Sequence, residues 1–319
     1  NCCHRCRQRR SGALPCAFSP PGSLVAVPST VELKDRADAL SSRRLFLLVA
    51  GPLFVLFLLT SNRAVPYHID AFSNVLPAWS LGSTGSVYLP DHEVLVQPDY
   101  FGNIAWLVPA QDSVASKYPP GAALLATPLY AMWPQDAEIW TVRGFNRPEA
   151  APVEIPVPSF WPPAVAAALS VALAMGFLAV SFRPLAGGAT ALIAAYLAGL
   201  GTSAWSVAAN ELWQHGPGMM WIALAGALAA RNLIAAGFAY GLAVFTRPVN
   251  AFIAGATGLY VAWQERSFWP AVQAGVGALA GLGALVAFNA AVFGEPSVLG
   301  GYANVFVDNA QSLDLVGYL

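Results

Sequence analysis

Long apolar stretches, separated by short turns that often carry a single arginine, dominate the pattern of this chain. A bilayer core needs about 20 apolar residues per helix, and several stretches approach or exceed that length. They are 45–60, 161–182, 184–208, 217–230, 232–245, 248–263 and 268–293. The shorter ones within 217–263 suit broken or tilted helices. The pattern predicts an all-α fold, a polytopic transmembrane helical bundle of about seven spans.

A further apolar stretch, 119–133, decides the topology. It has only about 15 residues, which is short for a crossing. If it stays on one side, residues 61–160 form a single extracytoplasmic loop, and three later arginines fall in short cytoplasmic turns. These are Arg183, Arg231 and Arg266. If it crosses, all three face outward, against the positive-inside rule. We therefore expect 119–133 to be an interfacial or re-entrant helix, within a large first loop that carries juxtamembrane helices.

The same parity divides the chain into segments. Residues 43–60 form the first transmembrane helix, and Arg43 and Arg44 at its start place the N-terminus in the cytoplasm. A signal peptide is the alternative, but no small-residue cleavage site follows. Residues 161–293 then form the transmembrane bundle, and 294–319 form a second extracytoplasmic loop. Because the chain stops directly after that loop, we expect it to be a fragment.

Composition agrees with a membrane protein. Of the 319 residues 56% are apolar and 10% are charged, whereas soluble domains carry about 25% charged residues. A net charge of −1 leaves no basic surface for nucleic acid. All four cysteines lie in the first 16 residues, near His4: Cys2, Cys3, Cys6 and Cys16. Their spacing lacks the paired CxxC units of zinc sites, so we expect 1–42 to be an unstructured cytoplasmic leader whose first 30 residues need not be native.

Polar residues gather on the side that this topology places outside. Ionisable groups at membrane depth are costly and usually mark a pathway or a site. The candidates are Asp70 near the end of the first span, Lys117 and Tyr118 before two prolines, Glu211 and His215 between two spans, and Arg247 before Pro248. Each has a structural alternative. Asp70 could be a loop aspartate or a helix N-cap, and Lys117 a lysine that snorkels to the interface. Glu211 and His215 could form an interfacial cap beside Trp213, and Arg247 would be cytoplasmic if the spans are misplaced.

Two of these candidates suggest specific chemistry. Glu211 and His215 are four residues apart and would share a helix face. Such a pair suits a metal, a proton relay or hydrogen bonds to a polar headgroup, yet no third metal ligand is evident. For a bound phosphate, Lys117 offers a point charge and Arg247 a bidentate guanidinium.

These segments together resemble the GT-C superfamily of polytopic glycosyltransferases, which includes protein mannosyltransferases and aminoarabinose and arabinofuranose transferases. Besides Asp70, the resembling segments are KYPPG at 117–121, GTSAWSVAANELWQHGPGMMWIALA at 201–225, GLAVFTRP at 241–248 and NAAVFGEPSVLGGY at 289–302. The resemblance covers about residues 44–302. The chain departs from the family in having one acid early in the first loop where many members have two, and in lacking their further spans and distal domain.

The resemblance implies an enzyme that moves a sugar from a polyprenyl-phosphate carrier to a hydroxyl acceptor on a glycan, lipid or protein, at the extracytoplasmic face of the bilayer. It implies a general base at Asp70 and no cofactor, with Asp70 and Glu211 as ligands if a divalent cation is needed. Substrate-binding residues would be Lys117, Tyr118, Glu211, His215 and Arg247. Lys117, His215 and Arg247 would meet the phosphate, and Glu211 would orient His215 or contact sugar hydroxyls.

Two other functional classes compete with this one. A transporter or flippase for a lipid-linked or small polar substrate is the main alternative, but transporters often show internal repeats, and the two halves of this chain show none. A non-catalytic membrane scaffold would not need the outward cluster of ionisable residues. The alanine-rich composition favours a multi-pass protein of the bacterial plasma membrane.

Overall fold

The computed structural model describes residues 35, 37–63, 69–97, 106–133, 136–144 and 149–302, with the backbone alone for 69 and 70. Most of the predicted leader, its cysteines and residues 303–319 lie outside this part of the chain. The described chain is mostly helical. Its helices are α2 (Ser42–Thr60), α3 (Ile69–Thr84), α4 (Ala123–Met132), α5 (Trp161–Leu200), α6 (His215–Ala229), α7 (Leu233–Thr246), α8 (Asn250–Glu265) and α9 (Trp269–Phe293).

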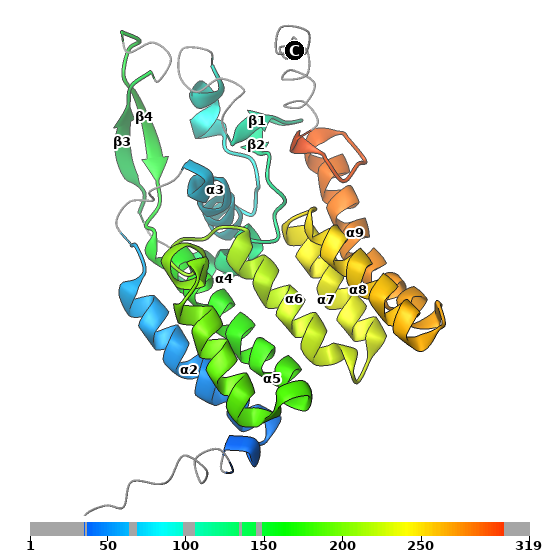
Figure 1. The fold of residues 1–319 in the computed structure, drawn as a ribbon. Helices are drawn as coiled ribbons and strands as arrows, with labels where there is room; N and C mark the ends of the chain where they lie inside the picture. Colours follow the sequence, from blue (N-terminus) through cyan, green and yellow to red (C-terminus); the bar gives the residue numbers. More distant parts are fainter. Residues whose placement is uncertain are drawn as a thin grey trace, which may run out of the picture.

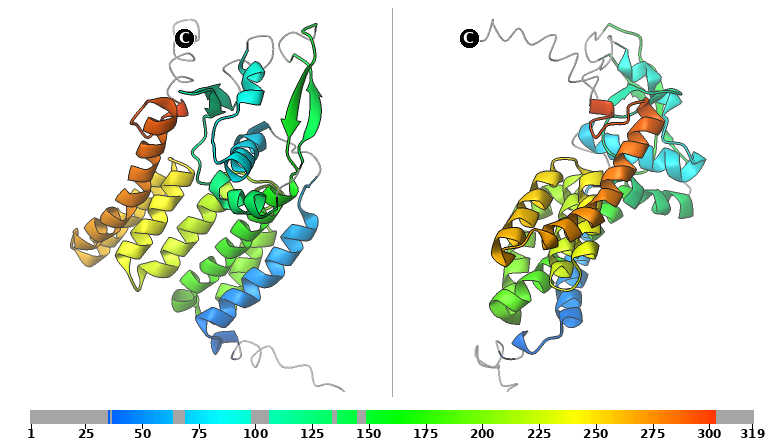
Figure 2. Two further views of the ribbon diagram at one scale, coloured as in Figure 1. Left: turned by 180° about the vertical axis from the view of Figure 1, so that it is seen from behind. Right: turned by 90° about the vertical axis from the view of Figure 1, so that its right-hand side faces the viewer.

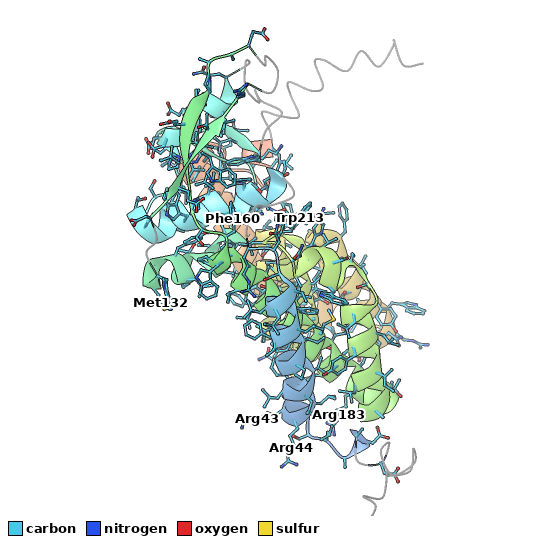
Figure 3. The ribbon with its side chains drawn as sticks, turned by 90° about the vertical axis from the view of Figure 1, so that its left-hand side faces the viewer. Arg43, Arg44, Met132, Phe160, Arg183 and Trp213 are labelled. Carbon is cyan, nitrogen blue, oxygen red and sulfur yellow. The ribbon has the colours of Figure 1, made fainter. Side chains whose placement is uncertain are left out.

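The helices α2 and α5–α9 lie together as a bundle, and the other elements gather over one end of it (Figures 1 and 2). We call this end, where α2 finishes and α6 begins, the loop end. Figure 3 shows Arg43, Arg44 and Arg183 at the opposite end, which we call the arginine end. Within the described residues, three helices are long and apolar enough to cross a membrane: α2, α5 and α9.

The 40-residue helix α5 is in fact a hairpin of two legs. Gly187 has φ +79°, a left-handed conformation that an L side chain rarely adopts, and Pro184 precedes it by three residues. The legs then pack on each other, because a Cβ at Gly199 would lie 3.2 Å from Met175 Cγ. The predicted apolar segments 161–182 and 184–208 correspond to these two legs. That each leg crosses a bilayer stays a prediction.

The second leg runs parallel to α2. Tyr196 donates a hydrogen bond to the carbonyl of Leu48 at 2.7 Å, and Trp205 Nε1 donates to Thr60 Oγ1 at 2.9 Å. Trp205 lies in the π-helix η3 (Ala204–Ala208) that follows the leg. The later residue of each helix is therefore paired with the later residue of the other, nearer the loop end. The chain returns to the loop end just before Glu211 and His215.

The next three helices are shorter than the thickness of a hydrocarbon core. With α6 at 15 residues, α7 at 14 and α8 at 16, a rise of 1.5 Å per residue gives lengths of about 21–24 Å. A hydrocarbon core is about 30 Å thick. The prediction of about seven spans is therefore confirmed only as a mostly helical bundle with three helices of spanning length.

Close backbone contact joins α7 to α9 and leaves α8 at the edge. A Cβ at Gly281 would collide with the backbone of Gly241, and one at Gly277 would collide with Ile234 O and the amide of Phe238. Small residues permit such approach where lipid supplies no hydrophobic force between helices. On α8 the side chains of Phe252 and Trp263 are 79% and 75% exposed, so this helix is poorly covered by protein.

Two antiparallel β-hairpins stand at the loop end, and the all-α prediction missed them. The strands are β1 (Leu107–Pro109) with β2 (Val114–Ser116), and β3 (Glu138–Val142) with β4 (Val153–Val157). A two-stranded hairpin is only marginally stable by itself. Here the loop-end core supports both, since Leu107, Val114, Ile155 and Val157 are buried in one cluster.

The predicted interfacial segment 119–133 contains the helix α4, which has only 10 residues. At about 15 Å, α4 is half as long as the roughly 30 Å hydrocarbon core is thick. It packs on α3, where a Cβ at Gly82 would lie 2.8 Å from Tyr130 Cβ. The position of α4 at a membrane interface stays a prediction.

Candidate functional site

The turn between α5 and α6 holds a buried carboxylate. Glu211 is only 7% exposed; its Oε1 accepts from Asn62 Nδ2 at 3.1 Å, and its Oε2 accepts from Trp213 Nε1 at 3.4 Å. The backbone amide of Asn62 donates to Asn210 Oδ1 at 2.7 Å. The end of α2 and the turn before α6 are therefore joined by polar contacts, which satisfy a group that would be costly to bury alone.

These polar contacts continue to the end of α7. The ring of Trp213 lies 5.7 Å from that of His215, centroid to centroid, and His215 Nδ1 lies 2.7 Å from Arg247 Nη1. A guanidinium can only donate, so Nδ1 is the acceptor and the imidazole is neutral, with its proton on Nε2. We call Asn62, Glu211, Trp213, His215 and Arg247 the polar cluster. Figure 3 shows Trp213 at the loop end of the bundle.

The structure corrects the predicted geometry of Glu211 and His215. Helix α6 begins at His215, so Glu211 precedes the helix and does not share a helix face with the histidine. The reason lies in Pro217, which has no N–H and suits only the first turn of a helix. Glu211 and His215 instead both contact Trp213, Glu211 through the indole Nε1 and His215 through its ring.

Helix α3 brings Asp70 to the same region. Asp70 is the second residue of α3, and its side chain lies outside the described atoms, so its predicted role as a base stays a prediction. The next residue, Ala71, lines a small cavity of about 10 Å³ together with Asn62 and Glu211. That volume is about the size of one water molecule. The start of α3 is therefore beside the polar cluster.

Lys117 and Tyr118 lie on another side of α3. Ser73 and Pro77 of α3 share a second small cavity with Tyr118. The Lys117 Nζ atom lies 5.5 Å from the centroid of the Tyr118 ring, within the range of a cation–π contact. The Tyr118 ring meets that of Tyr302 edge-on, with 5.6 Å between centroids. These three residues form a separate group, which we call the tyrosine pair with Lys117.

Backbone contacts connect this group to the end of α7. A Cβ at Gly121 would lie 2.6 Å from Thr246 Cα, and one at Gly301 would lie 2.7 Å from Lys117 Cα. The segment 117–121 thus runs from the loop after α9 to Thr246, directly before Arg247. The structure therefore gathers every predicted site segment at the loop end, and shows a direct side-chain contact for the Arg247–His215 pair.

Sequence reasoning missed Asn62 and Tyr302 as members of the site. Asn62 Nδ2 donates to Glu211 Oε1, yet the two residues are 149 positions apart in the chain. A polar residue directly after the first span was the one available signal. In the part of the chain that the structure describes, no group of three His, Cys, Asp or Glu side chains is placed to hold a metal ion.

No protein-family model matches the chain, and no curated protein or solved structure matches it significantly.

Proposed function

We propose that the chain is a membrane glycosyltransferase of the GT-C type, which moves a sugar from a polyprenyl-phosphate carrier to a hydroxyl acceptor at the loop end. The observation that carries the proposal is the polar cluster at the end of apolar helices. In it a buried carboxylate binds Trp213, whose ring lies beside a neutral histidine that contacts an arginine. Ionisable groups in such a place are costly and usually functional. The start of α3, with Asp70, lies beside them.

The proposal includes the membrane topology. Seven helical legs alternate in direction across the described bundle: α2, the two legs of α5, and α6 to α9. Arg43, Arg44 and Arg183 share one end (Figure 3), which the positive-inside rule assigns to the cytoplasm. The loop end would then face the cell exterior of a bacterial plasma membrane. The shorter helices α6–α8 would cross with local thinning of the bilayer.

The chemistry follows from the charges. The acceptor hydroxyl attacks the anomeric carbon, its proton passes to Asp70, and the bond from that carbon to the lipid phosphate breaks. The departing phosphate gains negative charge, which positioned donors stabilise. Arg247 spends one of its five N–H donors on His215, and the others suit a phosphate. His215 adds an Nε2–H donor, and Lys117 adds a cation.

A transfer assay with a polyprenyl-phosphate-linked sugar tests the proposal, using Asp70→Asn and Arg247→Ala with Arg266→Ala as a control for lost charge. Asp70→Asn should lower transfer by about 10²–10⁴-fold and leave donor binding unchanged. Arg247→Ala should weaken donor binding by roughly 10- to 100-fold, because a charge-assisted hydrogen bond is lost.

Two results would overturn the proposal. If both variants bind donor and transfer sugar like wild type, the site is elsewhere or the activity is different. If wild type moves the lipid-linked sugar across vesicles without transferring it, the protein is a flippase.

A further inference from the structure

The arginine end of the bundle contains a hollow that the proposed reaction does not use. It has a volume of about 460 Å³ and lies where the segment before α2, the turn of α5 and the end of α6 meet. Polar residues that line it include Asp38, Ser42, Arg183 and Arg231. The volume is within the usual range for small-ligand sites, about 300–1,000 Å³.

Two arginines supply the charge of this hollow. The half-buried Arg183 donates from Nη1 to Ser42 Oγ at 3.1 Å, which uses one of its five N–H groups. Arg231 follows α6 and is exposed. Among the described residues, neither guanidinium is paired with a carboxylate. The pair therefore keeps most of its capacity to bind an anion.

Asp38 is the acidic residue in the same hollow, and its carboxylate binds a backbone amide. Its Oδ1 accepts from the backbone amide of Ala189 at 3.0 Å, in the first turn of the second leg of α5. A carboxylate is stabilised there by the unpaired amides and the helix dipole. The hollow thus combines two cations with one carboxylate that caps a helix.

The wall of the hollow is closely packed. A Cβ at Gly187 would lie 2.8 Å from Asp38 Oδ1, and one at Gly188 would collide with the carbonyl of Ala37. The segment before α2 is therefore held against the turn of α5. Arg43 and Arg44 lie at the same end of the molecule (Figure 3). A fixed basic hollow at the end of a membrane bundle is the kind of site that binds anionic lipid headgroups.

We propose that this hollow binds the phosphate headgroup of an anionic phospholipid from the cytoplasmic leaflet. The guanidinium groups of Arg183 and Arg231 match phosphate oxygens in charge and geometry. A membrane lipid is the natural source of that phosphate, because α2 and α5 beside the hollow are apolar enough to lie in a bilayer. The inference depends on membrane location and not on sugar transfer.

The test measures binding of fluorescent phosphatidylglycerol to the full chain in a neutral, phosphate-free detergent. Arg183→Gln/Arg231→Gln should weaken binding about 30-fold, since each basic residue near a lipid surface contributes about 1 kcal/mol. A matched pair, Arg143→Gln/Arg266→Gln, loses the same charge away from the hollow and should bind like wild type. Arg183→Lys/Arg231→Lys keeps the charge, and its affinity for phosphatidylglycerol should stay within a few-fold of wild type. Thermal unfolding of this variant serves as the folding control.

Three results would overturn the inference. The first is wild-type affinity in the double Gln variant, and the second is an equal loss in the matched control pair. The third is displacement of the fluorescent lipid by inorganic phosphate as completely as by unlabelled phosphatidylglycerol, which would show a soluble anion site. Phosphatidylcholine should compete poorly, because its headgroup is neutral overall. Loss of sugar transfer would leave all of these outcomes unchanged.

Discussion

His92, in the 3₁₀ helix η1 (Pro90–Val96), is buried against strand β4, and this burial disfavours the charged form of its ring. Its Nε2 lies 3.0 Å from the carbonyl of Pro156, while Nδ1 is buried and has no hydrogen-bond partner within the described part of the chain. Burial lowers the pKa of His92 below 6.5, against the smaller raising effects of the Pro156 carbonyl and Asp91. As the pH falls below about 6.5, His92 becomes protonated in the unfolded chain, whereas burial disfavours protonation in the folded chain. Folding therefore becomes less favourable as the pH falls.

This effect predicts an acid-sensitive stability. Between pH 7.5 and pH 5.5, the wild-type unfolding equilibrium should shift by up to about tenfold per pH unit more than that of His92→Asn. Asn has no charge to gain. Denaturation midpoints in detergent at several pH values measure the difference. Parallel pH profiles for the two proteins would show that His92 does not titrate on unfolding.

At the residue scale, the sequence predicted which polar groups lie together, but it did not predict the contacts between them. Charge and parity placed Glu211, His215 and Arg247 on one side, and the structure puts them in one cluster. The i, i+4 relation failed because helix geometry holds only inside a helix, and α6 begins at His215. The sequence could not predict Asn62 as the partner of Glu211, because a contact between residues 149 positions apart produces no local periodicity.

At the scale of elements, the contact between α7 and α9 depends on glycine. Gly281→Ala should destabilise the protein by about 1–3 kcal/mol, because its Cβ would collide with the backbone of Gly241. Gly283→Ala is a matched control on the same helix, where a Cβ would meet nothing within 4 Å. The control should be neutral or slightly stabilising, since alanine favours helix. Thermal unfolding in detergent compares them, and equal midpoints would contradict this packing.

Apolar length predicted helices well and strands not at all. Stretches such as 268–293 correspond closely to α9, because a lipid-facing helix must be apolar along its whole length. The strands of the loop end have only three to five residues each, too few for an alternating pattern to stand out. Their stability comes from the core beneath them, which sequence windows do not see.

For the whole molecule, the topology is the main prediction. With Cys2, Cys3, Cys6 and Cys16 replaced, a cysteine at Ser86 should react with a membrane-impermeant thiol reagent in intact cells, because Ser86 follows α3 at the loop end. A cysteine at Ser267, in the turn between α8 and α9, should react only after the membrane is opened. The reverse pattern would place the loop end in the cytoplasm and invert the assignment of both sites.

The pairing of α7 with α9 also has a consequence for biosynthesis. The backbone surface that Gly237 and Gly241 present is covered by α9, which the ribosome makes only after the whole of α8. During that interval this side of α7 lacks the helix that covers it in the folded protein. A nascent chain halted within α8 would therefore expose a glycine-rich helix surface to insertion chaperones, and release from them would wait for α9.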